Sequence, residues 1–126
     1  MRNLIFSLMC MAVCSVALGQ AASIQWMSLE EAVEAQKKEP RKIMMDVYTQ
    51  WCGPCKMVAP ILEEIASEND SIVIAKLNVD ENPQTAASYG ITSIPTMNIY
   101  SGGQVVKTII GAKPKAALLA DLAEYL

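Results

Sequence analysis

The sequence predicts a single α/β domain in which a central mixed β-sheet is flanked by helices on both faces. Strand-like apolar runs alternate with segments of helical periodicity along most of the chain. This alternation favours parallel strands joined by helical crossovers. Near the end, Gly102-Gly103 separates two strand-like runs, which predicts a hairpin and therefore one antiparallel pair. The expected order of elements is β-α-β-α-β-α-β-β-α.

The first three elements, a strand, a helix and a second strand, are expected between residues 24 and 48. A short apolar run at 24–27 predicts an edge strand. Ser28 with Glu31 three residues later has the form of a capping box, so a helix should begin there, and Pro40 should end it. The run at 43–48 has apolar residues on both faces, which is typical of a buried strand.

Prolines and glycines delimit the remaining elements. A helix is expected at 52–68 with a kink at Pro60, and a strand at 72–79 follows it. A short helix should occupy 82–90, where a proline suits the first turn and a glycine the end. The last elements are strands 96–100 and 105–110 and a final helix with Pro114 in its first turn and an apolar stripe that reaches Leu126.

The N-terminal segment, residues 1–19, has the pattern of a cleaved secretory signal peptide. Arg2 provides a positive start, an apolar run at 4–18 follows, and small residues lie at its end. The run is shorter than the ~20 residues that a membrane span needs. We therefore expect an exported protein, periplasmic or extracellular, whose domain is 20–126. A protein anchored to the membrane by an uncleaved leader remains the alternative.

Charge and length restrict the function further. The formal net charge is −3, and the leader contributes only Arg2, so the domain after it carries −4. An acidic chain argues against a nucleic-acid partner, which would require a basic surface. About 107 residues remain after the leader, enough for one domain and too few for two.

Two cysteines three residues apart carry the clearest chemical signal. Cys52 and Cys55 follow a strand and begin a helix, where free backbone N–H groups and the helix dipole favour negative charge. The thiolate is the form of cysteine that attacks disulfides. Gly53 and Pro54 give a tight link between the two thiols. The spacing therefore indicates a reversible dithiol/disulfide pair.

Two other interpretations of this spacing are weaker. A structural zinc site needs four ligands, usually Cys and His, but the chain has no histidine, and Cys10 and Cys14 lie in the predicted leader. We therefore expect no metal. A purely structural disulfide between residues three apart would close a very small loop and stabilise little.

Several segments together resemble the thioredoxin family, over about 43–126. Residues 51–60 resemble the family's redox turn and the helix after it. Residues 76–83 resemble its central strand and the following turn, and residues 89–96 resemble the loop that holds its cis-proline. Asp46 lies in register with these segments. The resemblance implies a thioredoxin fold and a thiol–disulfide oxidoreductase.

Carried over by position, the resemblance implies a role for four residues. Cys52 would be the exposed nucleophile that forms a mixed disulfide, and Cys55, more buried, would be the resolving thiol. Asp46 would accept the proton of Cys55 through water, with a pKa that burial raises, and Lys76 would be its charge partner. For Tyr48 the sequence indicates only packing.

The resemblance also implies a substrate groove beside the thiols. Pro95 would follow a cis peptide bond, and the backbone of the preceding residue would bond an extended substrate strand. The rim of this shallow apolar groove would consist of Trp51, Gly53, Pro54, Ile94, Gly111 and Ala112.

The expected function is reduction of protein disulfides outside the cytoplasm by a monomer. Gly53-Pro54 adds no charge or donor that would stabilise the Cys52 thiolate, which favours a less oxidising couple. The chain has no GxGxxG motif and we expect no cofactor, so electrons would come from a membrane thiol carrier. Two alternatives remain. One is a disulfide oxidant or isomerase for exported proteins, and the other is a peptide-binding module with incidental thiols.

Overall fold

The computed structural model describes residues 27–126 and has the predicted mixed sheet. The four strands lie in the order β2-β1-β3-β4; β1 and β2 are parallel, and the other pairs are antiparallel. The strands are β1 (Lys42–Tyr48), β2 (Ile72–Asn78), β3 (Thr96–Ser101) and β4 (Gln104–Ile110). The helices are α1 (Leu29–Lys38), α2 (Gly53–Glu68), α3 (Pro83–Ser88) and α4 (Lys115–Leu122). The predicted signal peptide lies outside the described residues.

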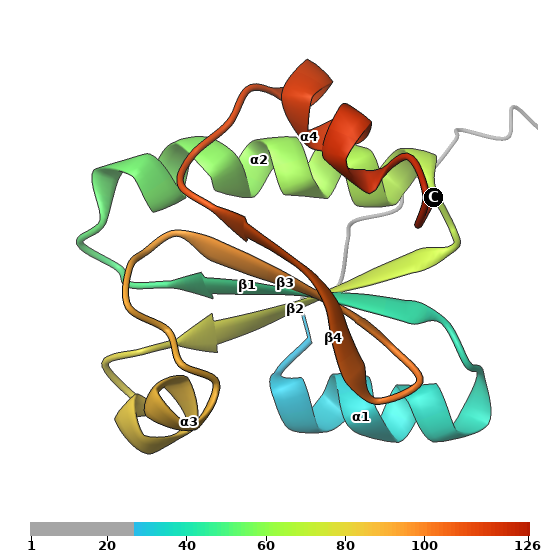
Figure 1. The fold of residues 1–126 in the computed structure, drawn as a ribbon, viewed down its shortest axis with the longest axis horizontal. Helices are drawn as coiled ribbons and strands as arrows, with labels where there is room; N and C mark the ends of the chain where they lie inside the picture. The colour runs from blue at the N-terminus through green and yellow to red at the C-terminus, as the bar shows by residue number, and fades with distance from the viewer. Residues whose placement is uncertain (1–26) are drawn as a thin grey trace, which may run out of the picture.

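The helices form two layers, as predicted. Helices α2 and α4 cover one face of the sheet, and α1 and α3 lie on the other (Figure 1). The larger core lies under α2 and α4, where Met44 of the central strand packs with Leu62 and Ile65 of α2. Alternate residues of β1, such as Met45 and Val47, are buried on the opposite face. Strand β1 is therefore buried on both sides, which explains why its sequence is apolar except for Lys42 and Asp46.

The two ends of the described chain differ in part from the prediction. Only the last residue of the predicted edge strand is described: Met27 makes an isolated parallel bridge with Ala75, and its carbonyl accepts a bond from the Lys76 N–H at 3.0 Å. At the other end, Pro114 is the N-cap of α4 and not part of its first turn.

The final helix is also shorter than predicted, and the carbonyls of the last two residues, beyond its end, bond to side chains elsewhere in the chain. It ends at Leu122, and Leu126 packs against the larger core from beyond the helix. The Lys42 ammonium donates to the carbonyl of Tyr125, and the Ser71 hydroxyl donates to that of Leu126. These bonds hold the last residues against the strands.

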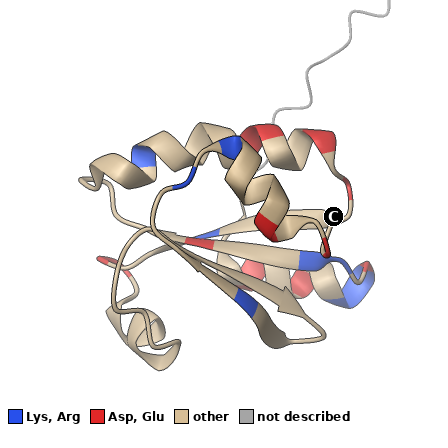
Figure 2. Cartoon of the chain, turned by 45° about the horizontal axis from the view of Figure 1, so that its top comes forward, with Lys and Arg blue, Asp and Glu red and all other residues tan. Residues whose placement is uncertain are grey.

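Charged residues lie mostly on the helices and loops, with both signs interspersed (Figure 2). Between residues 27 and 126, no helix is long and apolar enough to cross a membrane.

Candidate active site

The two cysteines form a disulfide at the start of α2, where the sequence predicted a reactive pair. Cys52 is the N-cap residue of this helix, and its Sγ is bonded to that of Cys55 at 2.09 Å. The Cys55 N–H also points at Cys52 Sγ, 3.2 Å away. A sulfur that accepts a backbone N–H at the positive end of a 16-residue helix is in a setting that stabilises a thiolate.

The prediction that Cys52 is exposed is wrong for the disulfide form. Cys52 retains 5% exposure and Cys55 3%, so both are buried. The predicted order, with Cys55 the more buried, holds by a narrow margin. Gly53 and Pro54, by contrast, are exposed. A substrate therefore meets the turn between the cysteines first and has access to only a small part of the Cys52 sulfur.

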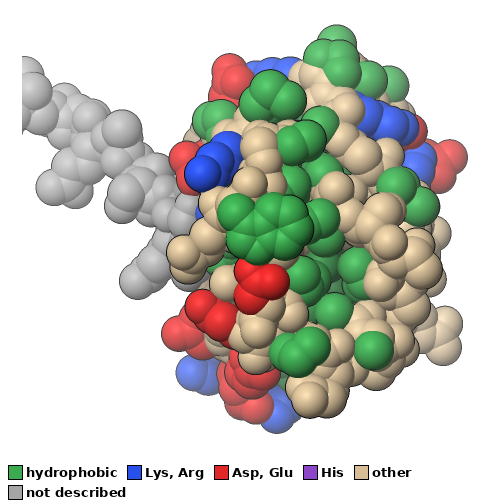
Figure 3. Space-filling view, turned by 90° about the vertical axis from the view of Figure 1, so that its left-hand side faces the viewer, with side chains coloured by type: hydrophobic (Ala, Val, Ile, Leu, Met, Phe, Trp, Pro, Cys, Tyr) green, Lys and Arg blue, Asp and Glu red, His purple; other side chains and the backbone are tan. Residues whose placement is uncertain are grey.

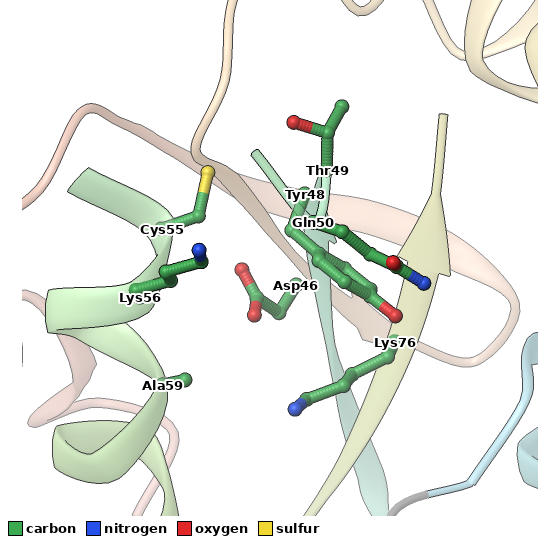
Figure 4. A pocket seen from close by; sticks show the side chains of 8 residues that line it. All are labelled: Asp46, Tyr48, Thr49, Gln50, Cys55, Lys56, Ala59 and Lys76. Atoms are coloured by element: carbon green, nitrogen blue, oxygen red, sulfur yellow. The ribbon is translucent and has the colours of Figure 1, made fainter. Parts of the chain in front are cut away.

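A cavity of about 330 Å³ lies behind the disulfide, between α2 and the sheet. Figure 4 shows the Asp46 carboxylate pointing into this cavity from the sheet, below Cys55 on the helix. The cavity is large enough for several water molecules. Its lining consists of Asp46, Tyr48, Thr49, Gln50, Cys55, Lys56, Ala59 and Lys76.

Asp46 has the environment of a carboxylate with a raised pKa. It is 2% exposed, and its Oδ1 accepts no hydrogen bond from the part of the chain that the structure describes. Burial raises the pKa of Asp46 from 3.8 to about 6, and the positive charge of Lys76 opposes this rise. At neutral pH the carboxylate is mostly ionised and ready to accept a proton.

Lys76 lies directly opposite Asp46 in the parallel pairing of β1 and β2, as the prediction of a charge partner requires. Burial lowers the pKa of the Lys76 ammonium, while Asp46 and Glu63 of α2 raise it. Two carboxylates, one on the sheet and one on the helix, therefore favour the charged form of Lys76.

Tyr48 contributes more than the packing that the sequence indicated. Its side chain lines the cavity, and the Lys76 Nζ lies 5.6 Å from the centroid of its ring. The signal was present in the sequence: residues two apart on a strand share a face, so Tyr48 had to lie on the same side as Asp46.

The predicted cis-proline loop lies at the same end of the sheet as the disulfide. The Ile94–Pro95 bond is cis, and the carbonyl of Pro95 accepts a bond from the Gly111 N–H at 2.9 Å. This bond joins the loop before β3 to the loop after β4. Figure 1 shows both loops beside the start of α2.

The predicted rim residues differ in exposure. Trp51 is 73% exposed, Ala112 is also exposed, and Ile94 and Gly111 are half-buried. Figure 3 shows apolar side chains gathered around a hollow on this end of the molecule. The end therefore presents a shallow apolar surface next to the disulfide.

One contact of the rim was not anticipated from the sequence. The indole Nε1 of Trp51 donates to Asp80 Oδ2 at 3.0 Å, across 29 positions of sequence. Asp80 follows the end of β2, the parallel neighbour of the strand that leads to Trp51. The only indication in the sequence was that Trp51 and Asp80 follow two strands expected to be parallel neighbours, whose ends lie close together. The bond favours one orientation of the exposed ring.

As for metals, the described residues contain no group of three or more His, Cys, Asp or Glu side chains that could hold an ion. The cavity behind the disulfide is lined by one acid, Asp46, and by the cations Lys56 and Lys76, and a buried acid next to a thiol is suited to accepting a proton.

Comparison with known proteins gives a consistent result. A family model described as Thioredoxin matches residues 22–124. A thioredoxin from Streptomyces clavuligerus is 57% identical over 82 residues, which cover 65% of this chain and 77% of that protein. A thioredoxin from Alicyclobacillus acidocaldarius is 45% identical over 100 residues, 79% of this chain and 91% of that protein.

Among solved structures, a mutant thioredoxin from Halobacterium salinarum is similar in fold. It has a TM-score of 0.69 and 30% sequence identity, and the match covers 79% of this chain and 87% of that one. The matched family region contains the cysteine pair, the buried carboxylate and the cis-proline described above. The chain therefore belongs to the thioredoxin family and is a protein-disulfide reductase of the thioredoxin type, with Cys52 and Cys55 as its redox-active pair.

Proposed function

We propose that this protein reduces disulfides of other proteins outside the cytoplasm. The observation that carries the proposal is the thiol pair at the start of α2 with the ionisable Asp46 behind it, on the same cavity as Cys55. A thiol exchange enzyme needs one thiolate to attack and a base for the second thiol. We assign these two roles to residues of adjacent elements, the thiols to the start of α2 and the base to Asp46 of β1.

In the first step, the Cys52 thiolate attacks one sulfur of a substrate disulfide. A bond forms between Cys52 Sγ and that sulfur, and the other substrate sulfur leaves as a thiolate. The N-terminus of α2 favours the negative charge on Cys52 before the attack. The backbone of Ile94, before the cis bond, would pair with the substrate strand.

In the second step, Cys55 resolves the mixed disulfide. Its thiol gives its proton to Asp46 through water in the shared cavity, and the resulting thiolate attacks Cys52 Sγ. The Cys52–Cys55 disulfide forms, and the second substrate thiolate leaves. Two electrons have then passed from the protein to the substrate.

The link between the cysteines supports the direction of transfer. Gly53 and Pro54 are exposed and carry no charge, so they add nothing that stabilises the reduced form through its thiolate. A couple without such stabilisation is a weaker oxidant. Reduction of substrates then requires a thiol donor, and for an exported protein we propose a membrane thiol carrier.

The direct test measures both activity and equilibrium. With dithiothreitol as electron source, the protein should reduce insulin disulfides, and a Cys52→Ser, Cys55→Ser variant should not. In a mildly reducing glutathione buffer, the Cys52–Cys55 pair should remain mostly oxidised. A pair that is mostly reduced in that buffer, with no insulin reduction, would instead support an oxidant or isomerase.

The compartment needs a separate test, because it rests on the pattern of residues 1–19. A tagged full-length chain should appear in the exported fraction, and mass spectrometry should find a new N-terminus at or soon after Gln20. An intact N-terminus in the membrane fraction would indicate an anchored protein. An intact chain in the cytoplasm would contradict the proposal.

A further inference from the structure

We propose that Tyr48 is a positioning residue for the second step, and that its ring holds the Lys76 ammonium beside Asp46. The inference rests on the role proposed above for Asp46 as the proton acceptor of Cys55. By holding Lys76 in place, the Tyr48 ring influences the pH range in which the Asp46 carboxylate is ionised.

The first support is the register of the strands. Asp46 and Lys76 are Cα partners in the parallel pair, and Tyr48 follows Asp46 by two residues on the same face. The Lys76 Nζ lies 5.6 Å from the ring centroid of Tyr48, within the range of a cation–π interaction. Figure 4 shows the Tyr48 ring and the Lys76 side chain on the same side of the cavity as Asp46.

The second support is that Lys76 has a choice of carboxylates. Burial lowers the pKa of the Lys76 ammonium, and the negative charges of Asp46 on β1 and Glu63 on α2 both raise it, so both carboxylates act on this ammonium. Asp46 is buried, whereas Glu63 is half-buried and nearer to solvent. A lysine side chain has four rotatable bonds, so an additional contact on one side favours that direction. The Tyr48 ring provides that contact on the side of the sheet.

The other charged groups around Tyr48 do not supply this function. Glu81, after β2, and Asp46 both raise the pKa of the Tyr48 phenol, and burial raises it most. The hydroxyl therefore stays protonated at neutral pH and brings no charge. Lys56 of α2 lines the same cavity but is exposed. The face of the ring, not its hydroxyl, is the part of Tyr48 that acts.

The experiment compares a variant that keeps the ring with variants that lose it. The pKa of Asp46 would be measured by NMR in the oxidised full-length protein labelled with ¹³C at the aspartate carboxyl carbon, with Asp46→Asn to assign the signal. Tyr48→Phe should leave this pKa unchanged. Tyr48→Leu should raise it, because Lys76 then spends less time beside the carboxylate. The expected change in the proton-binding constant is about two- to fivefold, the range of a single cation–π contact.

The same substitutions in a protein without Lys76 distinguish two effects on the pKa of Asp46: the position of the Lys76 ammonium and the entry of water into the cavity. Loss of the ring also admits water, which would lower the pKa of Asp46. In a Lys76→Met background only this hydration effect remains, so Tyr48→Leu should no longer raise the pKa there. Tyr48→Met, a ring-free variant with a longer and more flexible side chain, repeats the comparison if the leucine variant does not fold.

Two results would overturn the inference. One is an equal change on loss of the ring in the presence and in the absence of Lys76. The other is a Phe variant that behaves like the Leu variant, which would assign the effect to the hydroxyl. Failure of the proposed function looks different. If Asp46→Asn left the rate of mixed-disulfide resolution unchanged, Asp46 would not be the base, yet the coupling between Tyr48 and Lys76 would still be measurable.

Discussion

Helix α2 covers two regions of very different character. Near its start it forms the roof of a cavity lined by the acid Asp46 and by the cations Lys56 and Lys76. Toward its end it buries Leu62 and Ile65 completely against the larger apolar core. On the sheet below, the change occurs within two residues of one strand, from Met44 to Asp46, both on the face toward α2.

The difference shows how the fold can contain an unfavourable group. A buried carboxylate with an oxygen that accepts no hydrogen bond, such as Oδ1 of Asp46, lowers stability, and the usual outcome is that it takes up a proton at a higher pH. The apolar half of α2 supplies the burial that offsets this cost. The chemistry is confined to one end of the helix, so the two halves should respond differently to substitution.

The largest effect should come from removing the attacking sulfur. Cys52→Ser should lower insulin reduction by about a thousandfold or more, because a hydroxyl cannot take the place of a thiolate in exchange. The variant should still fold, since the disulfide closes only a short loop. Rates of insulin reduction and thermal unfolding measure the two properties independently.

Cys55→Ser is the matched variant for this prediction. It keeps the attacking thiol but lacks the resolving one, so it should accumulate a mixed disulfide that mass spectrometry can identify. Accumulation on Cys55 in the Cys52→Ser protein, and none in the Cys55→Ser protein, would show that the two roles are reversed.

The second effect concerns the apolar half. Leu62→Ala should lower the free energy of unfolding by about 2–5 kcal/mol, because it leaves a cavity in a completely buried site. The pH dependence of mixed-disulfide resolution should not change. Met57→Ala on the same helix is the control: Met57 is 63% exposed, so its removal should cost less than about 0.5 kcal/mol. Similar losses in both variants would mean that the buried packing of Leu62 does not stabilise the protein as described.

Most of this contrast could be predicted from sequence. The apolar run of β1 interrupted by Asp46, and the cysteine pair that follows it, indicated both the buried strand and the site. The burial of Cys52 could not be predicted, because the exposure of a short turn depends on segments that meet only in the folded chain. The same holds for the bond from Trp51 to Asp80, which joins two loops 29 positions apart. Alternation along a strand indicated the face of Tyr48, but not the position of Lys76 against its ring.

The third prediction concerns the buried acid. Replacing Asp46 should raise the free energy of unfolding, whereas Leu62→Ala should lower it. Burial raises the pKa of Asp46 from 3.8 to about 6, so between these pH values the folded state binds more protons than the unfolded state. Stability therefore falls as pH rises through this window. Asp46→Asn removes the ionised group and should stabilise the protein by up to about 3 kcal/mol above pH 6. Below the lower pKa the gain should disappear. Denaturant unfolding at a series of pH values measures this difference.

The same substitution should reduce function while it increases stability. Without Asp46 the Cys55 thiol has no base in the cavity, so resolution of the mixed disulfide should slow by about 10²-fold or more. In the unsubstituted protein this rate should fall as pH drops below about 6, the pKa of Asp46, and the variant should lack that dependence. Stopped-flow measurement of product release gives the rate. A stabilised Asp46→Asn variant with an unchanged rate and pH profile would leave the buried acid without a catalytic explanation.

The smallest effect lies at the rim, where neither buried apolar packing nor a buried charge is involved. Trp51→Phe removes the bond from the indole Nε1 to Asp80 but keeps an exposed aromatic ring. Because water can replace the lost bond at an exposed site, the loss of stability should be at most about 1 kcal/mol. An Asp80→Asn variant and the double variant complete a thermodynamic cycle, and the coupling between the two residues should account for most of the single effects. If the bond orients the ring for substrates, Trp51→Phe should raise KM for insulin more than it lowers kcat. A loss of kcat in Trp51→Phe as large as that in Asp46→Asn would mean that the rim takes part in the chemistry. The chemistry would then not be confined to the cavity under the first turns of α2.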